Sequence, residues 1–297
     1  MTRSQVVVLG DVINDVIVRP RGPIAVGTDT PSSIERSPGG SGANQAAWLA
    51  ALQTPVRFAA RVGAPDAADH RKALEQLGVE TCLAEDHDLP TGTIVVLVAP
   101  DGERSMFTDR GANLAFRAAD VPRHLLDDAV LLHVSAYQLF EPEPRSAVRQ
   151  LWAAALEAGI PVSIDPASVA GLREVGREQF LTWTAGAHLV FPNLDEGRLL
   201  TGLDEPDAIV AALLESYQVV ALKLGPAGTL VGAADGRRFA VSAQPAAVVD
   251  STGAGDAFCA GFLAAWVAGN DLDRCAAGAV DAAARAIGQV GARPRKP

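Results

Sequence analysis

Short runs of branched apolar residues alternate along the chain with longer stretches rich in alanine and leucine. The apolar runs predict strands at Val6–Leu9, Arg57–Ala60, Val130–Val134, Val162–Asp165, His188–Phe191 and Val219–Leu224. The longer stretches predict helices at Ala43–Leu52, Ala67–Leu77, Arg145–Ala158 and Glu205–Ser216, and a pair beginning at Gly253 and Leu272. Strands that are apolar throughout and separated by helices indicate a mostly parallel sheet covered on both faces. We therefore predict an α/β fold, a three-layer α/β/α sandwich.

Two segments, Asp15–Glu35 and Thr91–Thr108, break this alternation. They contain strand candidates at Val16–Val18, Thr93–Val98 and Arg104–Phe107, with a hairpin signal at Pro100-Asp101-Gly102. We predict that about residues 15–37 and 91–110 form a small β-sheet lid on a single domain that spans residues 1–297. Because the open edges of such a sheet invite pairing, we also expect a homodimer through Val16–Val18 and Thr93–Val98.

Composition narrows the functional classes. The chain has 297 residues, of which 48% are hydrophobic and 20% charged, which is typical of a compact protein with a sizeable core. Its 25 basic and 35 acidic residues give a net charge of −10. The only basic cluster is the tail Arg293–Lys296, which we interpret as a solvated terminus, so we expect no nucleic-acid partner.

The chain also gives no sign of export or membrane insertion. The apolar run near the N-terminus is too short for a signal peptide, and the apolar helix at Ala257–Gly269 is too short to span a bilayer. The three cysteines show no metal-binding spacing and fit reduced thiols. We expect a cytoplasmic protein with no membrane partner.

Several common catalytic signatures are missing. No lysine is followed by serine or threonine, so the phosphate-binding loop G-x-x-x-x-G-K-[ST] is absent. The patterns G-x-G-x-x-G, H-E-x-x-H and G-x-S-x-G are also absent. These absences argue against the usual ATPase, dinucleotide-binding, metalloprotease and serine hydrolase classes.

A glycine-rich segment, 250–256, opens the first of the paired helices. Glycine costs about 1 kcal/mol in a helix relative to alanine, so Gly253 and Gly255 need another explanation. Bare backbone N–H groups of Ala254, Gly255 and Asp256 at a helix start could hold a phosphoryl group during its transfer. Asp256 would accept the proton of the attacking hydroxyl, and the helix dipole is expected to keep its pKa low. The alternative is an ordinary Thr252 N-cap with an acidic first turn.

The segment 250–258 (DSTGAGDAF) resembles the C-terminal signature of the ribokinase-like (PfkB) carbohydrate kinases, and 39–47 (GGSGANQAA) resembles their N-terminal signature. The resemblance covers nearly the whole chain, with the motifs in the family's order. It implies an ATP-dependent kinase with a central sheet between helices and a β lid, using ATP and Mg²⁺.

The resemblance also assigns roles to individual residues. On the sugar side it implies contacts from Asp15, Gly39, Gly40, Ser41, Asn44 and Asp256. For ATP it implies Asn193, Lys223, Gly225, Gly228, Thr252, Gly253, Gly255 and Phe258. Glu196 and Asn193 would organise Mg²⁺, partly through water, and Asp250 with Thr252 would form half of a monovalent-cation (K⁺) site. Structural alternatives remain for three of these: a turn at Asp15, a helix cap at Asn44, and a chance N-x-x-E at Asn193.

The segments 101–104 and 110–113 are closer to ribokinases than to fructokinases. Two departures bear on the substrate. Ser41 stands where ribokinases usually carry lysine, and the chain lacks their glutamate near Tyr137. We expect a kinase that transfers the γ-phosphoryl group to a primary hydroxyl of a sugar, with a nucleoside kinase or a non-catalytic sensor as alternatives. A sugar-phosphate substrate would need cations, for which Arg36, Arg104 and Arg110 are the candidates.

Overall fold

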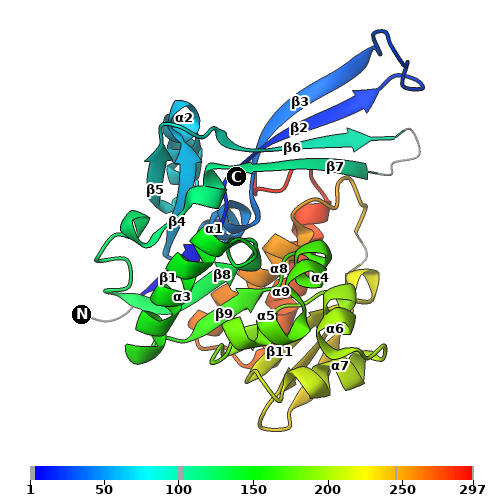
Figure 1. The fold of residues 1–297 in the computed structure, drawn as a ribbon. Helices are drawn as coiled ribbons and strands as arrows, with labels where there is room; N and C mark the ends of the chain where they lie inside the picture. Colours follow the sequence, from blue (N-terminus) through cyan, green and yellow to red (C-terminus); the bar gives the residue numbers. More distant parts are fainter. Residues whose placement is uncertain (1–3, 100–103, 245, 296–297) are drawn as a thin grey trace.

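The computed structural model describes residues 4–99, 104–244 and 246–295. A nine-stranded sheet lies between two layers of helices, and a separate four-stranded sheet extends from one end of it (Figure 1). The α/β/α architecture expected from the alternating pattern is therefore confirmed.

The large sheet has the order β13-β12-β11-β10-β9-β8-β1-β4-β5. Neighbouring strands are parallel from β5 to β11, while β12 and β13 are antiparallel additions at one edge. Its strands are β1 (Gln5–Leu9), β4 (Val56–Gly63), β5 (Glu80–Asp86), β8 (Ala129–Ser135), β9 (Val162–Asp165), β10 (Leu189–Val190), β11 (Val219–Lys223), β12 (Thr229–Ala233) and β13 (Arg238–Val241). The all-apolar β1 occupies the centre, where both faces are buried.

Each face of the large sheet is covered by its own apolar cluster. One cluster packs α1 (Ser41–Ala51), α2 (Ala64–Glu75), α8 (Ala254–Val267) and α9 (Leu272–Ile287) on the sheet. The other packs α3 (Pro142–Glu157), α4 (Val169–Val175), α5 (Arg177–Trp183), α6 (Leu194–Thr201) and α7 (Pro206–Leu213) on the opposite face. Short 3₁₀ turns lie at Ala112–Ala115, Ala118–Asp120, Ala136–Gln138 and Gly225–Ala227. No helix in the described part of the chain is long and apolar enough to span a membrane.

The carboxyl ends of the parallel strands meet at one edge of the sheet, where ligands bind in open α/β folds. Asp165 ends β9, Lys223 ends β11, and Asp11 follows β1 at this edge. The N-terminus of α1 comes so close that a Cβ at Gly42 would lie 2.5 Å from the Cα of Gly10. Only glycine at this pair permits the approach, which brings the glycine-rich motif over the strand ends.

The small sheet has the order β3-β2-β6-β7, with β2 (Ile13–Pro20), β3 (Ser32–Gly39), β6 (Thr91–Val98) and β7 (Arg104–Gly111). The strand candidates are therefore correct in position, although each strand is longer than expected. The expectation that β2 and β6 carry the open edges is wrong, because these two strands pair with each other and β3 and β7 form the edges. The turn expected at Pro100-Asp101-Gly102 lies outside the described residues.

The alternating pattern misses several elements of the large sheet and its helices. Strand β5 reads ETCLAED, whose charges mark an edge strand rather than a buried one. The hairpin of β12 and β13 adds two strands with no helix between them, and α4, α5 and α6 have only 7 or 8 residues each. Such short elements give no clear period in the sequence.

Candidate active site

Asp256 lies where two helix N-termini meet. It occupies the first turn of α8, and its two carboxylate oxygens accept hydrogen bonds from the first turn of α1. Ser41 Oγ donates to Oδ1 at 2.7 Å, and Asn44 Nδ2 donates to Oδ2 at 2.9 Å. Asn44 therefore does not act as a helix cap. The two glycine-rich motifs, more than 200 residues apart in sequence, share this one carboxylate.

The protonation of Asp256 differs from the expectation. The helix dipole was expected to dominate and keep the pKa low. Instead, burial raises the pKa of Asp256 from 3.8 to about 7, and the hydrogen bonds from Asn44 and Ser41 only partly oppose this. Desolvation penalises the charged form more strongly than the helix start favours it. Asp256 is thus a better base near neutral pH than a typical aspartate.

The start of α8 is built around Gly253, which is the N-cap with φ 77°. The Thr252 N-cap alternative is wrong, because Thr252 Oγ1 donates to Asp250 at 2.6 Å. The N–H of Ala254 donates to the Ser251 carbonyl at 3.3 Å. In the part of the chain that the structure describes, the N–H groups of Gly255 and Asp256 have no protein acceptor. These two amides remain for an anion.

Asp11, to which the sequence interpretation gave no role, holds the N-terminus of α1 in place. It is 1% exposed, and its Oδ1 accepts from the N–H of Gly42 at 3.1 Å. Asp15 follows within β2, so the turn alternative for Asp15 is wrong. Burial and the nearby Asp11 raise the pKa of Asp15 to about 6, with Arg293 opposing them.

Arg293 corrects an expectation. The basic tail was interpreted as a solvated terminus, yet Arg293 Nη2 donates to the Gly39 carbonyl at 2.9 Å and Nε to Asn44 Oδ1 at 3.4 Å. Its Nη1 is buried without a hydrogen-bond partner among the described residues. Burial lowers the pKa of Arg293 to about 10, and Asp15 opposes this. The chain preceding Arg293 is fixed by Trp48, whose Nε1 donates to the Ala292 carbonyl at 2.9 Å.

A second guanidinium reaches the same region from the small sheet. Arg110, near the end of β7, has Nη1 3.4 Å from Asp11 Oδ2, and its Cζ lies 4.4 Å from the centroid of the Tyr137 ring. Arg110 was named as a candidate cation, and the structure places it at the strand ends. Of the other two candidates, Arg36 lies on β3 and has no such contact among the described residues, and Arg104 is the first residue of β7.

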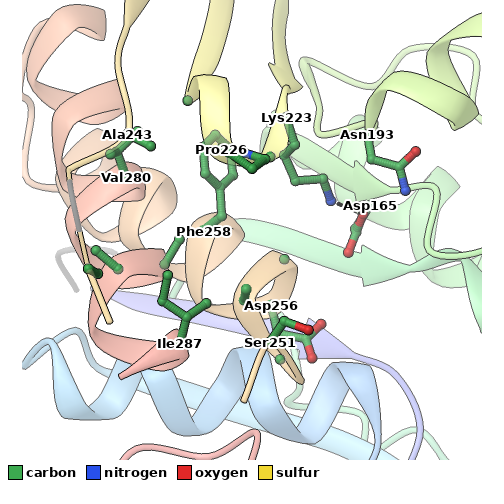
Figure 2. A pocket seen from close by; sticks show the side chains of 18 of the residues that line it. Asp165, Asn193, Lys223, Pro226, Ala243, Ser251, Asp256, Phe258, Val280 and Ile287 are labelled. Carbon is green, nitrogen blue, oxygen red and sulfur yellow. Dashed lines mark hydrogen bonds and ion pairs between the residues drawn. The ribbon is translucent and has the colours of Figure 1, made fainter. Parts of the chain in front are cut away.

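A pocket of about 960 Å³ extends from Asp256 along the start of α8. Figure 2 shows apolar side chains at one end, including Phe258, Val280 and Ile287, and polar ones at the other. Predicted residues that line it are Ser41, Asn193, Glu196, Lys223, Gly225, Gly228, Gly253, Ala254, Gly255, Asp256 and Phe258. Asp15, Gly39, Gly40, Asn44, Asp250 and Thr252 lie outside its lining.

Lys223 points into the polar end of this pocket toward Asp165 (Figure 2). Its Nζ lies 2.9 Å from Asp165 Oδ1, and a Cβ at Gly255 would be 3.6 Å from the same nitrogen. Burial alone would lower the pKa of Lys223, but Asp165 outweighs it and raises the pKa above the usual value. Lys223 therefore stays charged next to the free amides of α8.

Asn193 and Glu196 form a reciprocal cap at the start of α6. Asn193 Oδ1 accepts from the N–H of Glu196 at 2.9 Å, and Glu196 Oε2 accepts from the N–H of Asn193 at 2.8 Å. Burial raises the pKa of Glu196 to about 7, with Lys223 opposing it. A buried carboxylate beside an amide oxygen at the polar end of this pocket suits a hard cation bound partly through water.

Asp250 and Thr252 lie together beside the loop after α9. Asp250 Oδ1 accepts from both the N–H and the hydroxyl of Thr252, and Oδ2 accepts from the N–H of Gly291 at 3.1 Å. Asp250 therefore links the segment before α8 to the segment after α9. The described residues contain no cluster of three or more side chains suited to a metal ion.

The sequence interpretation missed Asp11, Asp165 and Arg293. Asp11 and Asp165 follow buried strands at the carboxyl edge, a position that could have singled them out. Arg293 gave no signal, because its role depends on how the last segment folds back.

Comparison with known proteins decides the family. The sequence model described as pfkB family carbohydrate kinase matches residues 3–297. The chain belongs to this family. Members phosphorylate an alcohol group using ATP, so this chain is a phosphotransferase of the carbohydrate kinase class.

Named relatives agree with this membership. The chain is 32% identical over 289 residues to an ATP-dependent ribose-1-phosphate kinase of Halopiger xanaduensis, covering 96% of this chain and 92% of the relative. It is 31% identical over 274 residues to a ribokinase of Arabidopsis thaliana, covering 87% and 69%. Among solved structures, a probable sugar kinase of Rhizobium etli superposes with a TM-score of 0.90 at 26% identity, covering 100% and 96%. An adenosine kinase of Sinorhizobium meliloti gives 0.88 at 25% identity, covering 99% and 96%.

Proposed function

We propose that this kinase transfers the γ-phosphoryl group of MgATP to a primary hydroxyl of a small carbohydrate, with Asp256 as the general base. One observation carries the proposal. Asp256 is hydrogen-bonded to Ser41 and Asn44 on one wall and lies at the end of the 960 Å³ pocket on the other. We call the side of the site that carries Ser41 and Asn44 the acceptor wall. A base that borders both this wall and the nucleotide pocket is placed for transfer of a phosphoryl group between them.

The chemistry follows from the groups around Asp256. The acceptor hydroxyl gives its proton to Asp256 while its oxygen attacks the γ-phosphorus, and the bond between the γ-phosphorus and the β,γ-bridging oxygen breaks, so that ADP leaves. A pKa of about 7 for Asp256 suits a base working near neutral pH. The free N–H groups of Gly255 and Asp256, with the ammonium of Lys223, stabilise the charge that moves with the phosphoryl group.

Glu196 and Asn193 would hold Mg²⁺, partly through water, and the ion would supply charge neutralisation on the phosphates. The apolar end of the pocket, with Phe258 and Ile287, would hold the adenine ring of ATP, and Gly225 and Gly228 would line its path. A K⁺ ion beside Asp250 and Thr252 stays a prediction based on the resemblance.

The acceptor would be bound by the residues beyond the pocket. Asp15 and Asn44 offer acceptors and donors to sugar hydroxyls, and Gly39 and Gly40 let the backbone approach. The guanidinium groups of Arg110 and Arg293 favour a second acceptor class, a sugar that carries a phosphate or carboxylate. The relative named as a ribose-1-phosphate kinase supports testing this class.

We also propose that the small sheet acts as a lid on a single catalytic domain that works in the cytoplasm. By strand register, Asp15 lies on one face of the sheet, and Val16, Val95 and Phe107 share the other. Val16, Val95 and Phe107 form an apolar row across that face, with Arg36 of β3 at its end, and Phe107 is 62% exposed. Homodimerisation through this face would bury it.

A phosphotransfer screen tests the function. ADP release is measured with pentoses, ketohexoses, 2-keto-3-deoxy acids, sugar phosphates and nucleosides as acceptors. Asp256→Asn should abolish turnover on the best acceptor while ATP still binds by calorimetry. Near-normal kcat in Asp256→Asn would refute the assigned base. Acceptor binding without ADP production across the screen would favour a sensor instead.

A further inference from the structure

A chain of buried polar side chains runs from Asp256 into the interior of the protein. Ser41 Oγ donates to Asp256 and accepts from Gln45 Nε2 at 3.2 Å. The same Gln45 nitrogen donates to Asp165 Oδ2 at 2.9 Å. Gln45 lies one turn after Ser41 on α1 and is completely buried. The mechanism above assigns it no role.

The orientation of the Gln45 amide is determined by its neighbours. Its Nε2 faces the Asp165 carboxylate, which accepts, so its Oε1 faces His133 Nε2 at 3.1 Å. Because an amide oxygen only accepts, the ring proton lies on His133 Nε2. His133 Nδ1 then accepts from Ser163 Oγ at 2.8 Å. Burial lowers the pKa of His133 to about 4, so the ring is neutral at pH 7.

This orientation constrains the Ser41 hydroxyl, which has a single proton. With one lone pair of Oγ taken by the N–H of Gln45, the proton is left to point at Asp256. Asp165 is held in the same way on its other side, where Oδ1 accepts from Lys223. Gln45 therefore contacts both the acceptor wall and the polar end of the nucleotide pocket.

We propose that Gln45 is a positioning residue, which directs the Ser41 hydroxyl onto Asp256 and aligns Asp165 with Lys223, while His133 fixes its amide orientation. The inference rests on the proposed function, because it gives Asp256 the role of base. It adds a specific route by which a residue that touches no substrate controls the reaction.

The acid limb of the kcat-against-pH profile reports on the ionisation of Asp256. The other groups near Asp256 must therefore be the same in the variant and in the wild type. Replacing Gln45 by methionine keeps the length of the side chain and removes only its hydrogen bonds. The titratable and charged groups that surround Asp256 from the strand ends, the small sheet and the tail all remain in this variant: Asp11, Asp15, Arg110, Tyr137, Asp165, Lys223 and Arg293.

The first experiment measures kcat and KM against pH for Gln45→Met with the best acceptor. We expect a loss of about tenfold in kcat and an upward move of the acid limb by about one pH unit, since a hydrogen bond to the carboxylate loses its alignment. The matched control is Gln150→Met on α3, because exposed Gln150 also donates to a serine four residues earlier, Ser146. A Gln45→Met profile within about twofold of the wild type overturns the proposal.

A double-mutant cycle tests the route through Ser41. If Gln45 acts on Asp256 through this hydroxyl, the acid limb of Ser41→Ala/Gln45→Met lies where that of Ser41→Ala lies. If the acid limb of the double variant moves by the sum of the shifts in the two single variants, the route from Gln45 through Ser41 is overturned.

A spectroscopic measurement needs neither turnover nor a variant. The ¹⁵N shifts of His133 in the wild-type protein should report a neutral ring with its proton on Nε2 from pH 6 to 8. A proton on Nδ1 overturns the orientation of Gln45 and the proposal with it. If the wild type transfers phosphate to no acceptor, the proposed function fails, and the tautomer still decides whether this network exists.

Discussion

Replacing Asp256 by asparagine should stabilise the fold at alkaline pH while it removes activity. Burial raises the pKa of Asp256 from 3.8 to about 7, so the folded state binds this proton more tightly than the unfolded chain does. The stabilisation linked to this proton is complete below pH 3.8 and is lost as the pH rises through about 7. At pH 8 the wild type therefore keeps a buried charge that the asparagine variant lacks.

The size of the effect follows from the two pKa values. A difference of about 3 pKa units corresponds to about 4 kcal/mol at pH 8, as an upper limit. The side-chain oxygen of the introduced asparagine still accepts from Ser41, but its NH₂ group faces the NH₂ group of Asn44. The variant therefore loses one hydrogen bond, which lowers its stability by about 1 kcal/mol. The variant should gain about 3 kcal/mol at pH 8. At pH 5.5 the native Asp256 is already protonated, so the gain should fall by about 2 kcal/mol.

Urea unfolding at pH 8.0 and pH 5.5 measures both values for the wild type and Asp256→Asn. Asp281→Asn, at an exposed position of α9, controls for the loss of a carboxylate without burial. Equal stability of the wild type and Asp256→Asn at pH 8, or a gain that does not change with pH, would refute the reasoning.

Three further predictions concern the C-terminal segment, the start of α8 and the small sheet. Arg293→Ala should raise the acceptor KM about tenfold with little change in the ATP KM, because it unties Gly39 and Asn44; Arg295→Ala, at an exposed position, should change neither. Gly253→Ala should lower the free energy of unfolding by about 2 kcal/mol, since φ is +77° and the Cβ would lie 2.7 Å from Ala292. Gly255→Ala fits the fold and should lower kcat instead, so unfolding curves and steady-state kinetics distinguish the two variants. Phe107→Lys should convert the expected dimer to a monomer in sedimentation velocity; a wild type that is monomeric at micromolar concentration would contradict the dimer.

The sequence predicts the architecture well where burial imposes a period. Strand β9 has the predicted bounds, and α1 and α8 begin within two residues of the predicted positions, because apolar runs and glycine-rich starts are local signals. Strand β5 escapes prediction because it is an edge strand in which Glu80 and Glu85 face solvent and Asp86 is buried against Arg61. The hairpin of β12 and β13 escapes prediction for another reason, because it follows β11 without the crossover helix that separates parallel strands.

In the site, too, short motifs can be predicted from the sequence, whereas contacts between distant segments cannot. The motifs around Asn44 and Asp256 identify two parts of the site in the sequence. The direct contact between Asn44 and Asp256 depends on how α1 and α8 pack over the strand ends. The helix dipole at Asp256 can be expected from the sequence, whereas the desolvation that outweighs it is a property of the packed interior. Arg293 is a tail residue by composition and a site residue only after the chain has folded back.

The contact between Arg293 and Gly39, the last residue of β3, has a consequence for biosynthesis. The proposed acceptor wall joins segments from opposite ends of the sequence, so translation of residues 11–256 leaves it unfinished. A nascent chain cannot complete this wall until Arg293 has emerged from the ribosome and threaded back against Trp48 and Asn44. We expect acceptor binding to develop only after this last segment has folded back, and a fusion placed after residue 295 would begin near Gly39 and Asn44.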